Sequence, residues 1–164
     1  MASPMLNLLV DSDLPSRFPE DSGPAERLTL IAGWLMGISD TQARFAWLVE
    51  RARLQPPVPE ADRRPEYLVP GCQVRLWLVP EFRHGRGWFR IDSDAVSLKA
   101  VGGLLGEYYS GLTTEEIIAS RPEFLETFGL ATNLAVSRRR TVWRLRELIR
   151  EFAQRHQPTE GTHA

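Results

Sequence analysis

Cys72 is the one cysteine in the 164 residues, and its neighbours suggest a chemical use for it. It follows Pro70 and Gly71, a turn signal, and precedes the short apolar run 76–79, which is typical of a strand. The thiol is therefore predicted at the tip of a loop that enters a sheet. A soft nucleophile there can reach a second protein, which favours sulfur chemistry. On residue type alone, however, an inert buried thiol is the more common outcome.

Such a thiol needs help from its surroundings to react. A free thiol is only a few per cent thiolate at neutral pH. A nearby cation, for which Arg138 is the candidate, or the positive end of a helix would increase that share. The sequence by itself does not bring either one to Cys72.

The composition restricts the class of protein. With 164 residues, 43% of them hydrophobic, the chain fits one domain with a substantial core. A net charge of −1 gives no bulk attraction to nucleic acid or to a membrane surface. Neither a signal peptide nor an apolar run of about 20 residues is recognisable. One cysteine cannot form an internal disulfide, which fits a reducing compartment, so we expect a cytoplasmic protein.

The order of predicted elements indicates an α+β fold. We expect a flexible N-terminal leader over 1–23, a single domain over 24–156 and a frayed tail over 157–164. Apolar spacing predicts a helix over 25–36 closed by Gly37, and a second one capped by Ser39 or Asp40. The runs 73–82 and 87–92 predict a hairpin turning at 83–86, with a third short strand near 67–69. The sheet would thus be small and antiparallel, with about three strands packed against several helices.

Helices follow the hairpin. Leu98, Val101, Leu105 and Tyr108 predict the buried face of one, and Thr113 with Glu116 has the spacing of a capping box for a short one. Pro122 is typical of another start, with three aromatic or apolar residues packing inward behind it. Ser137 is predicted to cap the last helix. Its apolar stripe consists of Val142, Leu145, Leu148, Ile149 and Phe152.

Other functional sites find little support. The histidines 84, 156 and 163 do not have metal-ligand spacing with Cys72, and we infer neither a metal nor a bound cofactor. Gly102, Gly103 and Gly106 lie inside a helical pattern, so close helix packing explains them better than a phosphate loop. The arginine-rich last helix could bind nucleic acid or an acidic partner, but a solvated helix face is the commoner use of such mixed charge.

Five blocks in register resemble the SufE family of sulfur acceptors. They are Gly71-Cys72-Gln73 before an apolar strand, Asp92-Ser93-Asp94-Ala95 before a lysine-containing helix, Leu112-Thr113 with Ile117-Ile118, Arg121-Pro122, and Leu134 with Ser137-Arg138 before the final helix. The resemblance extends over residues 27–152. It departs from the family pattern at Val74, Asn133 and Thr141, where the family usually has Ser, His and Gly, and this marks a divergent member.

The resemblance implies a function. A protein of this family docks on a pyridoxal phosphate-dependent cysteine desulfurase of the SufS type, receives sulfur as a persulfide, and relays it to iron–sulfur cluster assembly, where a downstream scaffold complex is a further candidate partner. The persulfide would form on Cys72, with Gly71, Gln73, Asp94 and Arg138 around the loop or the partner. Such a protein is a sulfurtransferase-type accessory, and the pyridoxal phosphate belongs to the desulfurase.

Two of these residues have more than one interpretation. Asp94 is either a helix N-cap or a restraint on the cysteine loop, and Arg138 is either a solvated arginine or a neighbour of that loop. In the family the cysteine is sheltered at rest and moves out on docking, and we expect Leu76, Trp77 and nearby aromatic residues to shelter Cys72. The alternative function is an interaction module that modulates a desulfurase or another partner without carrying sulfur.

Overall fold

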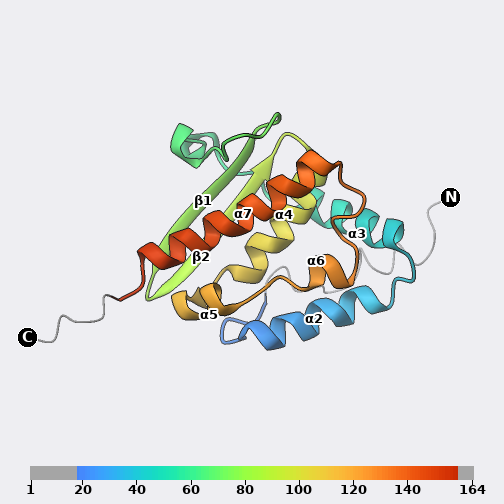
Figure 1. The fold of residues 1–164 in the computed structure, drawn as a ribbon, viewed down its shortest axis with the longest axis horizontal. Helices are drawn as coiled ribbons and strands as arrows, with labels where there is room; N and C mark the ends of the chain where they lie inside the picture. The colour runs from blue at the N-terminus through green and yellow to red at the C-terminus, as the bar shows by residue number, and fades with distance from the viewer. Residues whose placement is uncertain (1–17, 159–164) are drawn as a thin grey trace, which may run out of the picture.

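The computed structural model describes residues 18–158 and has an α+β fold (Figure 1), as predicted. Its antiparallel sheet has the order β1-β2-β3, with β1 at Leu76–Arg83, β2 at Arg86–Ser93 and β3 at Leu112–Thr113. The helices are α2 (Pro24–Met36), α3 (Thr41–Leu54), α4 (Val96–Tyr109), α5 (Thr114–Ala119), α6 (Phe124–Thr127) and α7 (Val136–Arg155). Two 3-10 turns, η1 (Glu60–Asp62) and η2 (Pro65–Tyr67), precede the sheet.

The hairpin of β1 and β2 forms as predicted. Leu76 pairs with Ser93 at one end and Arg83 with Arg86 at the other. The two turn residues between the strands, His84 and Gly85, have φ values of 52° and 74°, the left-handed backbone that a two-residue type I′ turn requires. The start of β1 and the end of β2 therefore lie together. This brings the residues that precede β1, Cys72 among them, next to the residues that follow β2.

The third strand is not where the sequence predicted it. β3 lies at Leu112–Thr113 and pairs with Arg86 and Gly87 of β2, at the turn end of the hairpin. The predicted segment 67–69 forms only an isolated bridge, between Leu68 and Trp77. The sequence pattern located an extended segment beside β1 correctly, but a two-residue strand such as β3 is too short to have a pattern of its own.

Helix boundaries agree with most of the predicted signals. The Asp40 side chain accepts a hydrogen bond from Ala43 N–H at 2.9 Å, and the Thr113–Glu116 capping box is present. Ser137 was wrongly predicted as a cap, because α7 begins at Val136 and its N-cap residue is Ala135, two residues before Ser137. No side chain within residues 18–158 caps this end of α7. Asp94 does not cap α4 either: Ala95 stands there, and its N–H is bonded to the Ser93 hydroxyl at 3.1 Å.

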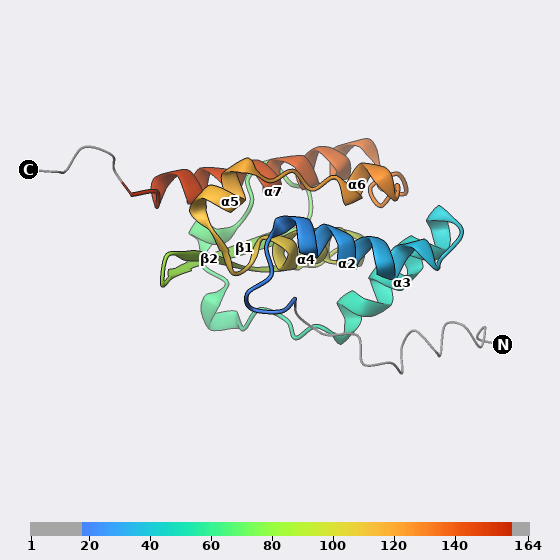
Figure 2. The same cartoon turned by 90° about the horizontal axis from the view of Figure 1, so that it is seen from below.

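The helices pack around α4 in layers. α4 lies against β2, with α3 and α2 on one side of it and α7 on the other, where α7 also contacts β1 and α5 (Figure 2). At the C-terminal end of α4, the buried Arg27 of α2 donates to the Tyr108 carbonyl at 2.9 Å. It thereby satisfies one of the carbonyls that the end of α4 leaves unpaired. Phe18, ahead of the predicted domain start at residue 24, stacks on Trp34 at 5.4 Å between ring centroids. Residues 1–17 of the predicted leader and 159–164 of the predicted tail lie outside the described residues.

Two of the three glycines of α4 permit the close approach of the helix to the sheet. A Cβ atom on Gly106 would lie 2.7 Å from Ile91 Cδ1 and 3.3 Å from the Phe89 carbonyl oxygen. On Gly102 it would lie 3.2 Å from Leu145 and 3.3 Å from Ile91. For these two, the packing explanation is confirmed. Gly103 differs, since a Cβ atom there would have no described atom within 4 Å beyond its own stretch of helix.

The contrast between Gly106 and Gly103 gives a matched test. We expect Gly106→Ala to destabilise the protein by about 1–3 kcal/mol, because the new methyl group forces Ile91 and the strand away. Gly103→Ala should stabilise it by up to about 1 kcal/mol through helix propensity alone. Urea unfolding of both variants measures the difference. Equal free energies of unfolding would contradict the packing argument.

The phenol of Tyr109 is buried where α4 meets α5, and its hydroxyl donates to the Ser120 carbonyl at 2.9 Å. Burial raises the pKa of Tyr109 from its ordinary 10.0 to about 12, more than the neighbouring Arg146 lowers it. The pKa of Tyr108 is raised as well, also by burial. Ionising these phenols therefore opposes folding.

Stability should consequently fall at alkaline pH. The raised folded-state pKa of Tyr109 contributes stability that is fully present below pH 10 and is lost as the pH rises towards about 12, because the unfolded chain ionises first. We expect Tyr109→Phe to reduce this alkaline loss and to leave a smaller one from Tyr108. At neutral pH it should cost about 1 kcal/mol for the missing hydrogen bond. Urea unfolding across the alkaline range measures both effects, and an unchanged slope would contradict the assignment.

Candidate functional site

Cys72 lies near the tip of a short loop that is closed by backbone hydrogen bonding. Val69 N–H donates to the Leu76 carbonyl at 2.9 Å, so residues 70–75 project from the start of β1. Gly71 has a φ of 79°, a backbone conformation that favours glycine, while a Cβ atom there would have no described atom within 4 Å beyond its chain neighbours. The turn therefore needs Gly71 for its backbone and not for space. The predicted place of the thiol, where a loop enters the sheet, is confirmed.

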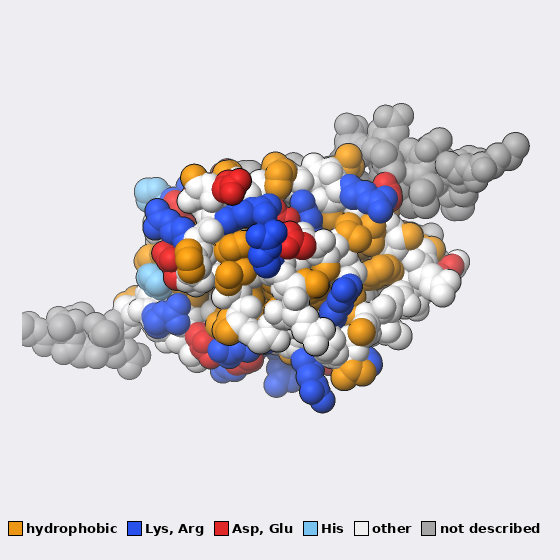
Figure 3. Space-filling model, turned by 90° about the horizontal axis from the view of Figure 1, so that it is seen from above, with side chains coloured by type: hydrophobic (Ala, Val, Ile, Leu, Met, Phe, Trp, Pro, Cys, Tyr) orange, Lys and Arg blue, Asp and Glu red, His pale blue; other side chains and the backbone are white. Residues whose placement is uncertain are grey.

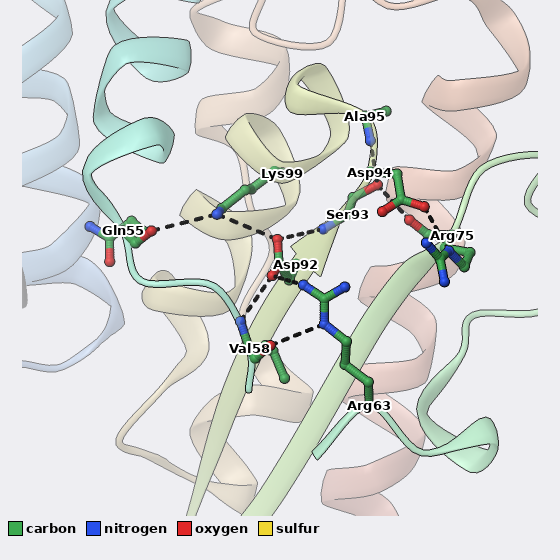
Figure 4. A network of polar contacts seen from close by, with 9 residues as sticks. All are labelled: Gln55, Val58, Arg63, Arg75, Asp92, Ser93, Asp94, Ala95 and Lys99. Carbon is green, nitrogen blue, oxygen red and sulfur yellow. Dashed lines mark hydrogen bonds and ion pairs between the residues drawn. The ribbon is translucent and has the colours of Figure 1, made fainter. Parts of the chain in front are cut away.

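Arg75 fixes the downstream end of this loop, a role that the sequence did not indicate. Its carbonyl accepts from the Ser93 hydroxyl at 2.7 Å and from Asp94 N–H at 3.1 Å. Its side chain pairs with Asp94, Nε to Oδ2, at 2.7 Å (Figure 4). The Asp94 side chain thus pairs with the root of the cysteine loop and does not cap α4. Of the two interpretations of Asp94, the geometry agrees with the loop restraint.

Asp92, two residues before Asp94, is buried and also pairs with cationic side chains. Its Oδ2 accepts from Val58 N–H and from the Arg63 guanidinium, both at 2.9 Å. Its Oδ1 accepts from Ser93 N–H at 2.8 Å and faces Lys99 Nζ at 3.4 Å (Figure 4). One carboxylate therefore joins the proline-rich segment after α3, the end of β2 and the first turns of α4. The loop restraint by Ser93 and Asp94 is built on this anchor.

The first two turns of α7 form the wall that faces the thiol. A cavity of about 130 Å³ lies between the loop and this helix. Its lining consists of Gly71, Cys72, Gln73, Val74, Ser137, Arg138 and Thr141. The Thr141 hydroxyl lies 3.8 Å from Cys72 Sγ, within the range of a hydrogen bond to sulfur. Cys72 itself is half-buried and packs against the edge of the core.

The structure brings the predicted site residues together to different degrees. Gly71, Gln73 and Arg138 share the cavity with Cys72, and Gln73 is exposed. The Arg138 guanidinium donates to the Ser97 hydroxyl at 2.7 Å, which ties the start of α7 to the start of α4. Asp94 does not line the cavity and is connected to the cysteine loop through its ion pair with Arg75. Of the sequence departures, Val74 and Thr141 line the cavity, whereas Asn133 does not and bonds to the Thr41 carbonyl at 3.4 Å.

The predicted shelter of Cys72 by Leu76, Trp77 and nearby aromatic residues stays a prediction. Leu76 and Trp77 are both buried, but neither lines the cavity beside the thiol. The cavity is walled by α7 instead, and Ser137, Arg138 and Thr141 make that wall polar. Sequence proximity suggested the residues that follow Cys72, while Thr141 is 69 positions away along the chain. No local pattern could have indicated that contact.

A much larger cavity lies away from the thiol. It has a volume of about 1020 Å³ and lies between the outer side of the hairpin, the proline-rich segment and α4. Several of its cations are already paired: Arg90 with Asp62 at 2.9 Å and Lys99 with Asp92 at 3.4 Å, while Arg51 pairs with Glu107. Cys72 is not part of it. We therefore assign the candidate chemistry to the small cavity, which contains the nucleophile.

Two further searches concern metal and membrane. Within residues 18–158, the structure gathers no group of three or more His, Cys, Asp or Glu side chains suited to a metal ion. Over the same residues, none of the helices has the length and apolar character needed to cross a membrane.

Comparison with known proteins shows the family. Residues 31–153 match the model of the SufE family, described as an Fe-S metabolism associated domain. The chain belongs to the SufE family, which confirms the resemblance and links the protein to iron–sulfur metabolism. A solution structure of a hypothetical protein from Thermus thermophilus matches with a TM-score of 0.63 and 21% identity, over 79% of this chain and 94% of that one. This similarity shows the shared fold.

Relatives in sequence differ in length. An uncharacterised SufE-like protein of Synechocystis sp. is 29% identical over 100 residues, which are 61% of this chain and 63% of that protein. One of Rhizobium etli is 30% identical over 125 residues, 71% of this chain and 82% of that protein. The chloroplastic quinolinate synthase of Nicotiana tabacum is 27% identical over 123 residues, which are 73% of this chain but 17% of the synthase.

Asp92 at the end of β2 and Asp94 directly after it allow a test that separates the buried anchor from the loop restraint. We expect Asp92→Asn to destabilise the protein by about 3 kcal/mol, because Arg63 and Lys99 lose a buried partner. Asp94→Asn should cost less than about 1 kcal/mol, since both partners of that ion pair are largely exposed. It should nevertheless speed amide hydrogen exchange over residues 71–75. Thermal unfolding and hydrogen exchange measure the two effects, and equal destabilisation by both substitutions would contradict the division of roles.

Proposed function

We propose that this protein is a sulfur acceptor and carrier. It docks on a pyridoxal phosphate-dependent cysteine desulfurase, receives sulfur on Cys72 as a persulfide and relays it to iron–sulfur cluster assembly in the cytoplasm. The observation that carries the proposal is the placement of the half-buried Cys72 thiol near the tip of a projecting loop, against the start of α7. Membership of the SufE family supports it. By accepting sulfur, the protein frees the desulfurase cysteine for its next turnover.

The transfer step follows from thiol chemistry. The Cys72 thiolate attacks the outer sulfur of the persulfide on the desulfurase cysteine. An S–S bond forms between Cys72 Sγ and that sulfur, while the S–S bond to the desulfurase cysteine breaks and that cysteine leaves as a thiolate. One sulfur atom moves and no external oxidant or reductant is needed. The start of α7, with Ser137, Arg138 and Thr141, lines the cavity that contains the attacking sulfur.

The surface around the cavity suits a protein partner. Three apolar side chains at this end of the molecule are exposed: Leu68 by 36%, Val96 by 40% and Val136 by 55%. Figure 3 shows one face of the molecule, on which hydrophobic side chains lie among basic and acidic ones. Apolar area with charged groups around it is typical of a docking surface. A desulfurase bound beside the loop would face Cys72 directly.

A second function is favoured by the departures at Val74 and Thr141. Both residues line the Cys72 cavity, so this site differs from the family pattern at the place where sulfur would lie. A chain with an altered cavity could bind and modulate a desulfurase without carrying sulfur. The two functions differ in whether Cys72 is required.

Intact-mass measurement after incubation with a cysteine desulfurase and cysteine separates them. For the carrier we expect a gain of one or more sulfur atoms that reductant removes, because the added sulfur is held by an S–S bond. Cys72→Ser should show no gain and no stimulation of desulfurase turnover. If the Ser variant stimulates turnover as well as the unchanged protein does, the modulator is correct and the carrier proposal fails.

A further inference from the structure

The Thr141 hydroxyl has two acceptors within reach and one proton to donate. It lies 3.0 Å from the Ser137 carbonyl, one turn earlier in α7, and 3.8 Å from Cys72 Sγ. The first contact is an ordinary bond of a helical threonine to its own helix. The second crosses from α7 to the cysteine loop, a sequence separation of 69 residues. Thr141 is therefore a direct contact between the helix wall and the reactive sulfur.

A hydroxyl can form a hydrogen bond with this sulfur both when the sulfur is a thiol and when it is a thiolate. Its oxygen accepts a hydrogen bond from the thiol while its own proton remains on the Ser137 carbonyl. When the sulfur is a thiolate, the hydroxyl rotates and donates to it. Valine at this position would fill nearly the same volume and do neither. The contact thus depends on the hydroxyl and not on the shape of the side chain.

The cysteine loop is held at two points. At its root, the exposed ion pair of Arg75 with Asp94 restrains it. Near its tip, the contact that the structure gives to the sulfur is with Thr141. We propose that Thr141 is a positioning residue that holds Cys72 in the retracted position against α7, and so sets how often the loop is free to enter a partner. The inference rests on the proposed function for its meaning, but the contact can be tested without a desulfurase.

Amide hydrogen exchange over residues 71–75 is the first test. Exchange of these amides reports the fraction of molecules in which the cysteine loop has moved away from α7. We expect Thr141→Val to speed this amide exchange about threefold. That factor corresponds to the loss of a hydrogen bond whose free energy is at the weak end of the usual range. Thr141→Ser retains the hydroxyl and should exchange like the unchanged protein. Thr29→Val is the matched control, since it removes the same kind of helix bond, to the Ala25 carbonyl at 3.0 Å, in a helix that does not line the Cys72 cavity.

Desulfurase stimulation is the second test. A larger open fraction raises the apparent affinity for a partner that binds the open loop. Thr141→Val should therefore lower the half-stimulating concentration of this protein by about the same threefold factor. If no desulfurase is stimulated by the unchanged protein, the proposed function fails while the exchange test of Thr141 still stands. Unchanged loop exchange in Thr141→Val, or equal acceleration in Thr141→Ser, would overturn the proposal.

Discussion

The buried carboxylate of Asp92 is the interaction on which the site depends. A carboxylate with 4% of its side chain exposed must be paired, and Asp92 collects donors from Val58, Arg63, Ser93 and Lys99. These come from the segment after α3, the end of β2 and α4, so one charge joins three parts of the chain, and the end of β2 leads directly into the residues that contact the root of the cysteine loop. Asp92 and the pairing of β2 with β1 together fix the strand end from which Ser93 and Asp94 extend to restrain Arg75.

From this anchor outward, the constraints on Cys72 become weaker. The Asp92 cluster is buried, the backbone bond between Val69 and Leu76 closes the loop, and the ion pair of Arg75 with Asp94 is exposed. An exposed ion pair contributes about 0–1 kcal/mol, far less than a buried cluster whose loss exposes unpaired charges. The loop can therefore move while its base and the fold stay intact. A sulfur carrier needs this combination of a fixed base and a loosely held tip.

The sequence predicted the features that depend on near neighbours and missed those that depend on tertiary contacts. Gly71 signals the turn before Cys72 through residues only a few positions away. The wall of the cavity has no such signal, because Thr141 meets Cys72 only after α7 has packed across α4 and β1. Asp94 has a side chain suited to helix capping, but the fold places it against Arg75. A capping preference is worth about 1 kcal/mol, no more than many single tertiary contacts, so it does not decide where a polar side chain lies.

Magnitudes also show that a partner could release the loop. The contact of Thr141 with Cys72 and the ion pair of Arg75 with Asp94 each contribute on the order of 1 kcal/mol or less. Covering the exposed parts of the three apolar side chains near the cavity would contribute a stabilisation of about 1–3 kcal/mol. These amounts are comparable, so for the proposed carrier, docking on this surface would offset the loss of the two contacts when the loop moves outward. For the proposed carrier, the weakness of the restraints around Cys72 would make its exposure depend on a partner.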